Sequence, residues 1–298
     1  MTTLIDTGAP AKAKEYVARA AGESRPVGYL IAAICIGLVA IMMAPLVLSF
    51  FASIKPLAEA HETPPNYLPR GFTIENYLKV FEYQAGFLTY LSNSVLVAGL
   101  TIVLCLAFAV PAGYGLARFK IRFKEFWFIL LLAPLMVPYQ ALLTPLYLSF
   151  SKIGLANNYL GLAIVHAILQ LPFSIYLMRN SFEGIPKELE EAARVDGSTS
   201  MQTLTRIFMP LVVPGIVTVA LFAFIASWNE FLSALIFMNK ETSFTVPIML
   251  VSVRAGRLGA VDWGALQSGV VVSILPCVLI YVLLQRYYVA GFLNGAVK

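Results

Sequence analysis

The chain has 298 residues, of which 59% are hydrophobic and 12% are charged, with a formal net charge of +5 and a mean hydropathy of +0.79. Soluble domains carry about 25% charged residues, so this composition excludes a soluble globular domain that covers its surface with charge. Disorder requires low hydrophobicity and high net charge, so the bulk of the chain is expected to fold, with lipid as the solvent of its apolar surface.

The first apolar stretch predicts an uncleaved membrane anchor. Residues 1–28 read as a polar cytoplasmic tail, and Tyr29–Phe51 then forms an uninterrupted apolar run. At about 23 residues the run exceeds the core of a signal peptide and is long enough to cross the hydrocarbon core. No clear A-x-A cleavage pattern follows it.

Five further stretches have the length and hydropathy of membrane spans, so the sequence predicts an all-α polytopic helix bundle of six transmembrane helices. The transmembrane domain is expected over residues 29–290, with a short cytoplasmic tail at 291–298. Three prolines interrupt the third span and predict a kink or a re-entrant bend there. The five stretches are Leu91–Leu116, Phe126–Phe150, Tyr159–Leu177, Leu211–Phe237 and Gly264–Leu284, and the prolines are Pro134, Pro138 and Pro145.

The distribution of Lys and Arg among the loops predicts the orientation. With the N-terminus inside, the inner segments hold about twice as many basic residues as the outer ones, which places both termini in the cytoplasm. This bias also accounts for the positive net charge without nucleic acid. The three cysteines are far apart and there are two histidines, so neither a metal site nor a disulfide framework is expected.

The inner loop between the fourth and fifth spans, residues 180–210, predicts two short helices separated by Gly197. Pro186 suits the first helical position, and the acidic residues that follow it are favoured by the helix dipole. Ser198 is a suitable N-cap for a second helix that runs to Pro210. The apolar stripe of the first helix is expected to consist of Leu189, Ala192, Ala193 and Val195.

The acidic character of the first of these helices indicates what it contacts. Helices that lie on lipid headgroups are usually rich in Lys and Arg, whereas this one carries Glu188, Glu190 and Glu191. Small residues and exposed carboxylates suit a groove on another protein, with Glu191 offered to an arginine of that partner.

The same loop carries a pattern that resembles a known family. Glu191-Ala192-Ala193, three residues, Gly197, nine residues and then Ile207-Phe208-Met209-Pro210 is similar to the EAA motif of ABC importer permeases, E-A-A-x3-G-x9-I-x-L-P, with Met209 in place of Leu. The outer loop at 64–77, Asn93-Ser94, the segment 227–231 and the tail 291–298 resemble carbohydrate permeases. The chain therefore resembles a binding-protein-dependent inner-membrane permease subunit of the maltose-type second permease family.

The resemblance implies a function and a set of partners. The chain would form half of a translocation pore for a sugar or oligosaccharide in the bacterial inner membrane. Its partners would be a second permease subunit, a dimer of cytoplasmic ATP-binding subunits and a solute-binding protein. The chain has no G-x-x-x-x-G-K-[ST] pattern, so it is not expected to be an enzyme or to hold a cofactor, and ATP and Mg²⁺ would be used by the partner ATPase. The residues expected to couple to that ATPase are Glu191, Ala192, Ala193, Gly197, Ile207 and Pro210.

Polar residues inside the spans are candidates for contact with substrate. Asn93, Trp228, Asn229 and Glu230 are the substrate or pore candidates, although Asn and Trp also serve in helix packing and at membrane interfaces. His166 is expected to be a helix–helix hydrogen-bond partner. Arg254 and Arg257, in the outer loop 239–263, are candidate contacts for the binding protein, with a plain connecting loop as the alternative.

Other functions make different predictions. The same machinery could import glycerol-phosphate-type or other polyol solutes. A secondary transporter or channel predicts several buried ionisable residues and usually an internal repeat, whereas Glu230 is the only clear acid inside a span. A membrane-embedded enzyme would need a clustered catalytic constellation that two distant histidines do not supply.

Overall fold

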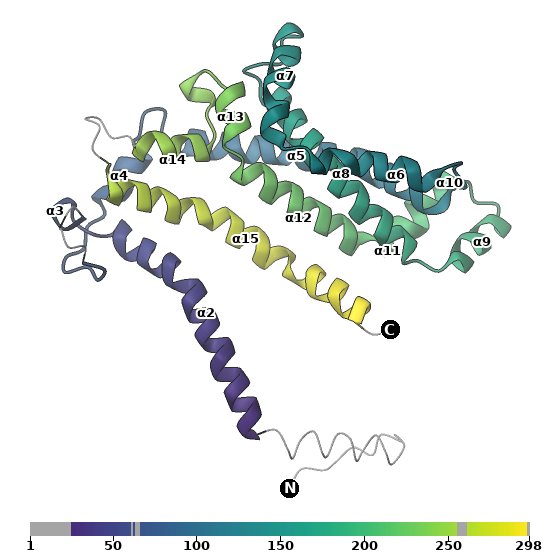
Figure 1. The fold of residues 1–298 in the computed structure, drawn as a ribbon, viewed down its shortest axis with the longest axis horizontal. Helices are drawn as coiled ribbons and strands as arrows, with labels where there is room; N and C mark the ends of the chain where they lie inside the picture. The colour runs from purple at the N-terminus through teal and green to yellow at the C-terminus, as the bar shows by residue number, and fades with distance from the viewer. Residues whose placement is uncertain (1–24, 61, 63–65, 255–260, 297–298) are drawn as a thin grey trace.

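The computed structural model describes residues 25–60, 62, 66–254 and 261–296, and within these ranges it contains helices and no strands (Figure 1). The all-α prediction is therefore confirmed. The helices that span or line the membrane region are α2 (Arg25–Ser53), α5 (Phe87–Arg118), α6 (Lys124–Leu132), η1 (Ala133–Met136), α7 (Tyr139–Lys152), α8 (Tyr159–Glu183), α12 (Val213–Asn229), α13 (Leu232–Phe237) and α15 (Trp263–Ala296).

Shorter helices lie at the two ends of the bundle. One end carries α3 (Leu57–Ala60), α4 (Glu75–Phe81), η3 (Glu241–Ser243) and α14 (Val246–Arg254). The opposite end carries α9 (Lys187–Val195), α10 (Ser200–Gln202), the π-helix η2 (Thr203–Phe208) and α11 (Met209–Leu211). In Figure 1 these two sets lie at opposite ends of α5 and α8.

Four helices of the described residues are long and apolar enough to cross a membrane singly, and the count reaches six if each of two bent pairs is one span. The bend in the third predicted span is confirmed, because α6–η1 and α7 meet at 95° around the prolines at 134 and 138. The fifth predicted span, Leu211–Phe237, is wrong as a single helix. The chain bends by 77° ahead of Val213, and the helix then ends at Asn229 before α13 begins.

Helix α5 is the centre of the bundle, because its most extensive neighbour is α8 and it also packs on α12. Gly113 allows α5 and α8 to approach closely. A Cβ at this position would lie 2.6 Å from the Met178 Cβ and 2.8 Å from the Arg179 amide nitrogen. Small residues at helix crossings are the usual device for tight packing in membranes, where van der Waals contact drives association.

Helix α2 diverges from this bundle and packs mainly against α15 (Figure 1). None of its most apolar 18-residue window is buried within the chain. Its C-terminal end is nevertheless fixed by hydrogen bonds, since the Asn76 side chain donates to the Ser53 and Lys55 carbonyls at 2.9 and 2.8 Å, and the Ser268 hydroxyl donates to the Ser53 carbonyl at 3.0 Å. The exposed apolar surface of α2 is thus held in a defined direction.

Substitution of Gly113 by Ala is expected to lower the free energy of unfolding by about 1–3 kcal/mol, because α5 and α8 must separate to make room for the added carbon. Thermal unfolding of the detergent-solubilised protein measures the effect. Gly99→Ala is the matched control in the same helix, since nothing lies within 4 Å of a Cβ at that position. Equal melting temperatures for the two variants would contradict the close contact.

Candidate functional site

The loop that carries the EAA-like pattern folds as a helix, a left-handed turn and a second helix. The sequence predicts Pro186 at the first helical position, but Pro186 is the N-cap of α9, which begins at Lys187. Gly197 adopts φ +79° and ends α9. Its amide donates to the Arg194 carbonyl at 3.0 Å, and the Ser198 amide donates to the Ala193 carbonyl at 2.9 Å. This pair of bonds is a Schellman motif, which requires the left-handed residue that glycine supplies at no steric cost.

The second helix begins one residue later than predicted. Thr199, not Ser198, is the N-cap of α10: its hydroxyl accepts from the Gln202 amide at 3.3 Å, while the Gln202 side chain accepts from the Thr199 amide at 2.9 Å. This reciprocal capping box needs Gln three residues after the cap, and the Ser198 amide is already bonded to the end of α9. The chain then passes through η2, where Ile207 is half-buried, to the exposed Pro210.

Of the predicted apolar stripe of α9, Ala193 alone is buried in the protein, while Leu189, Ala192 and Val195 are exposed. Glu190 and Ala193 are the buried residues of this helix, at 9% and 3% exposure, whereas Leu189 and Val195 are exposed. Ala193 therefore packs inside the chain. The outward face of the helix, available to another protein, presents Glu191 and Ala192 together with the exposed apolar side chains.

Glu190 is drawn inward by Arg118, the last residue of α5. The Arg118 side chain is 4% exposed, and its guanidinium donates to the Phe182 carbonyl at 2.5 Å and to the Ile185 carbonyl at 2.6 Å. Its Nη1 lies 4.0 Å from the Glu190 carboxylate, which also accepts from Arg194 at 2.6 Å. One buried cation thus joins the end of α5, the end of α8 and the inner face of α9.

Aromatic rings fill the space beneath this contact. Tyr114 lies edge-on to Phe119, Phe182 and Phe208, with ring centroids 5.4–5.7 Å apart. The guanidinium of Arg118 lies 4.9 Å from the centroid of Phe208, within cation–π range. These rings connect α5 and α8 with η2, so α9 and the segment after it rest on one packed layer.

A second arginine closes the same end of the bundle. Arg179 of α8 makes two hydrogen bonds to Glu125 of α6, at 2.7 and 3.1 Å, and one to Glu183 at 2.8 Å. Its guanidinium also lies 4.0 Å from the Phe128 ring centroid. Sequence reasoning missed the roles of both arginines. The available signal was a single basic residue at the end of an apolar span, which by itself is typical of an interfacial anchor.

Two of the four candidate substrate residues are structural. The Asn93 side chain donates to the Thr242 and Phe244 carbonyls, both at 2.9 Å, and accepts from the Tyr159 hydroxyl at 2.9 Å. Trp228 is 4% exposed and stacks on Phe224 with ring centroids 5.3 Å apart. Both side chains are buried in contacts within the protein, so almost none of their surface is accessible to a solute.

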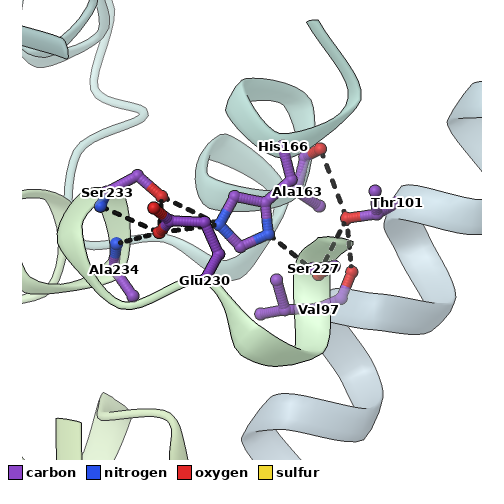
Figure 2. Close-up of polar contacts among 8 residues, drawn as sticks. All are labelled: Val97, Thr101, Ala163, His166, Ser227, Glu230, Ser233 and Ala234. Atoms are coloured by element: carbon purple, nitrogen blue, oxygen red, sulfur yellow. Dashed lines mark hydrogen bonds and ion pairs between the residues drawn. The ribbon is translucent and has the colours of Figure 1, made fainter. Parts of the chain in front are cut away.

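His166 links three helices, as Figure 2 shows. Its Nδ1 lies 2.8 Å from the Ser227 hydroxyl and its Nε2 lies 2.9 Å from the Ser233 hydroxyl. These bonds join α8 to α12 and α13 and confirm the expected helix–helix role. Glu230 lies between α12 and α13. Its carboxylate caps α13 by accepting from the Ser233 and Ala234 amides at 2.9 and 3.3 Å. The break in the fifth span is therefore held by side-chain hydrogen bonds.

The other two candidates line a groove. Asn229 is exposed and Glu230 is half-buried, and both border a groove of about 440 Å³ with Tyr139, Leu169 and Phe231. A second pocket of about 300 Å³ shares Tyr139 and Leu169 and extends along the prolines of the bent α6–α7 segment. The groove therefore lies between the start of α7 and the break between α12 and α13.

The remaining candidates lie at the outer loop and give no clustered site. Arg254 is exposed at the end of α14, and Arg257 lies outside the described residues. Within the part of the chain that the structure describes, no three His, Cys, Asp or Glu side chains are placed to hold a metal ion.

Comparison with known proteins agrees with this architecture. Residues 109–292 match the family model described as binding-protein-dependent transport system inner membrane component. The chain is 38% identical to a probable ABC transporter permease protein of Bacillus subtilis over 78% of this chain and 76% of that protein. It is 32% identical to the arabinooligosaccharides transport system permease protein of Halalkalibacterium halodurans, over 87% of this chain and 92% of that one.

Two further similarities come from an archaeal sequence and from a solved structure. The trehalose/maltose transport system permease protein of Thermococcus litoralis is 33% identical over 76% of this chain and 81% of its own length. A chain of a bacterial ABC transporter involved in the import of the acidic polysaccharide alginate superposes with a TM-score of 0.76 at 26% identity, covering 90% of this chain and 98% of that chain.

Replacement of Arg118 by Gln is expected to release α9 from the bundle, because breaking a buried charged contact costs about 3–5 kcal/mol. Amide hydrogen exchange over Lys187–Val195 should accelerate by roughly 100-fold, with little change in the middle of α5. Arg122→Gln removes the same charge from an exposed position four residues away and should leave the exchange of α9 unchanged. Slow exchange of α9 in the Arg118 variant would show that other contacts hold it.

Asn93→Ala is expected to lower the free energy of unfolding by about 2–3 kcal/mol, since two carbonyls and one hydroxyl lose their partner. Asn229→Ala removes one bond to the Ile225 carbonyl within its own helix and should cost less than about 0.5 kcal/mol. Thermal unfolding of both variants separates a packing residue from one that lines the groove. A larger loss for Asn229 would reverse these assignments.

Proposed function

Because the chain belongs to the family of binding-protein-dependent transport system inner membrane components, we propose that it forms half of the translocation pathway of an ABC importer for a sugar or oligosaccharide. Family membership makes the chain a multi-pass permease of the inner membrane that works in a complex with an ATPase and a binding protein. It carries no cofactor, and ATP is hydrolysed by a separate subunit.

The outward face of α9 is the contact for that ATPase. Glu191 and Ala192 are exposed on a helix whose opposite face is fixed through Glu190 to Arg118, and this single arrangement carries the proposal. Glu191 would pair with a basic residue in a cleft of the ATPase, and Ala192 would allow close approach. Gly197 would set the direction of the turn, while Ala193, Ile207 and Pro210 would act by shaping the loop.

The contacts of Arg118 with Glu190 and with the end of α8 explain how movement of α9 would reach the membrane helices. When the ATPase subunits close, force on α9 passes through Arg118 to α5 and through the Phe182 carbonyl to α8. Since α5 and α8 are also the most extensively packed helix pair of the described residues, they would move together. A second, related permease subunit would complete the pore on the other side.

The orientation follows from the same site. The ATPase is cytoplasmic, so α9 and the basic ends of α5 and α8 would face the cytoplasm, in agreement with the excess of Lys and Arg on that side. Both termini would then also be cytoplasmic. The exposed Arg254 would face outward, where the solute-binding protein docks, and Arg257 is a candidate contact in the same loop.

The residues that line the groove beside Asn229 and Glu230 favour a neutral sugar as the solute. Tyr139, Phe231 and Asn229 supply aromatic and amide groups, Glu230 supplies a carboxylate, and no basic residue is among those that line the groove. A glycerol-phosphate-type solute would need cationic donors for its phosphate, so that alternative is the weaker one. Relatives named for arabinooligosaccharide and trehalose/maltose transport point the same way.

Glu191→Lys is expected to lower ATP-dependent uptake by the reconstituted transporter by roughly tenfold or more, since reversing one partner of a buried interface pair costs about 2–5 kcal/mol. Uptake is measured in proteoliposomes with the cognate binding protein and a panel of labelled neutral oligosaccharides and glycerol phosphate. Glu188→Lys makes the same charge change one turn earlier, outside the motif, and should retain most uptake. Full activity of the Glu191 variant would contradict the coupling role, and uptake of glycerol phosphate alone would contradict the sugar.

A further inference from the structure

A cleft of about 590 Å³ lies beside α9, and Glu191 of the outward face is one of its lining residues. It is bounded by α9 on one side and by the end of α5 and the start of α6 on the other. Five basic and two acidic side chains line it, so its net charge is positive. The basic residues are Arg118, Lys120, Lys124, Lys187 and Arg194.

Much of this positive charge has no acidic partner among the described residues. Glu190 is already bonded to Arg194 and faces Arg118. Among the ion pairs of the described residues none includes Lys120, Lys124 or Lys187, although the Lys124 ammonium donates to the Ala117 carbonyl at 3.5 Å. In addition, the buried Nε of Arg118 has no hydrogen-bond acceptor. A donor buried without an acceptor costs free energy, so the cleft combines unpaired ammonium groups with an unsatisfied guanidinium nitrogen.

Apolar and aromatic side chains continue directly from these cations. Phe119 lines the cleft and is 43% exposed. Phe123, Phe126 and Trp127 follow in the turn between α5 and α6 and at the start of α6, and are 50–67% exposed. Lys124 and Trp127 are three residues apart in one helix, so an ammonium and an indole lie on neighbouring positions of one face, about one turn apart along the axis.

This order of groups matches the chemistry of a phospholipid. A headgroup phosphate requires several cationic N–H donors, and the acyl chains below it require exposed apolar surface within about one helical turn. Trp and Phe at that depth are typical of the membrane interface, and basic pockets between transmembrane helices on the cytoplasmic side bind anionic headgroups. An acidic segment of the ATPase would satisfy the charges but would leave the exposed aromatic side chains without a role.

From these observations we propose that the cleft binds the phosphate of an anionic phospholipid of the cytoplasmic leaflet, with phosphatidylglycerol as the simplest such lipid. The headgroup bridges Lys187 of α9 and Lys120 of the turn after α5, while the acyl chains pack against Phe123 and Trp127. The bound lipid thereby adds a second connection between α9 and the membrane helices, next to that of Arg118. The inference rests on the proposed function only in placing α9 on the cytoplasmic side.

Titration of the assembled transporter, purified in a mild detergent, with dioleoyl phosphatidylglycerol or dioleoyl phosphatidylcholine tests the site by native mass spectrometry. The wild type is expected to retain phosphatidylglycerol in preference to phosphatidylcholine. The double variant Lys120→Gln/Lys187→Gln should bind phosphatidylglycerol roughly 30-fold more weakly, since each of the two basic residues near an anionic headgroup contributes about 1 kcal/mol. Arg122→Gln, in the same turn but not lining the cleft, should bind as the wild type does.

Each other outcome overturns the proposal in a defined way. Equal retention of the two lipids, or equal loss in the Arg122 variant, means that no specific headgroup site exists. Complete displacement of lipid by millimolar inorganic phosphate assigns the site to free phosphate. Loss of the ATPase from the double variant with unchanged lipid binding assigns the cleft to an acidic segment of that subunit.

Two controls separate folding and coupling from binding. Size-exclusion elution and thermal unfolding of the double variant should match the wild type, and Lys120→Arg/Lys187→Arg should keep lipid binding if a misfolded loop is not the cause of its loss. Ala192→Trp, which alters the outward face at a residue that does not line the cleft, should lose uptake and keep phosphatidylglycerol. Failure of the lipid site with intact coupling, or of coupling with an intact lipid site, is therefore distinguishable.

Discussion

The buried guanidinium of Arg118 is the contact on which the arrangement of the loop at 180–210 depends. It donates to the Phe182 carbonyl in the last turn of α8 and to the Ile185 carbonyl just after that helix. It also faces the Glu190 carboxylate and lies over the Phe208 ring. A neutral side chain could supply one of these contacts, but only a long, forked cation reaches all of them. As a result α9 presents one fixed face to the bundle and the opposite face to a partner.

The same requirement for satisfied polar groups governs the breaks within the membrane. Where a helix is interrupted in a bilayer, its free backbone groups need partners inside the protein. At the break between α12 and α13 the partner is Glu230, which caps the second helix and lies 3.7 Å from His166. Near the N-terminal end of α5 the Asn93 side chain donates to the carbonyls around η3. Polar residues that look available for a solute are thus largely used to support irregular backbone.

The groove and the outward face of α9 lie apart in the bundle and are connected through α8. Asn229 and Glu230 border the groove, which also contacts the middle of α8 at Leu169, whereas α9, which carries Glu191, follows the C-terminal end of α8. The connection between them is a tightly packed helix pair with Gly113 at its crossing. This arrangement suits a subunit that transmits movement between an ATPase and a solute pathway. The exposed apolar length of α2 is consistent with a chain that completes its surface with lipid and a second subunit.

The sequence by itself determined the membrane class, the approximate spans, the bend in the third span and the left-handed turn at Gly197, because hydropathy, proline and glycine act through local chemistry. It also carried the motif that identifies the family. The tertiary structure decided which face of α9 is buried, that Thr199 replaces Ser198 as a cap, that the fifth span is broken, and that Asn93 and Trp228 are packing residues. Helical periodicity states which residues share a face but not which neighbour that face meets. The roles of Arg118, Arg179 and Glu230 are set by carbonyls, rings and carboxylates from other helices, and those distances exist only after the chain has folded.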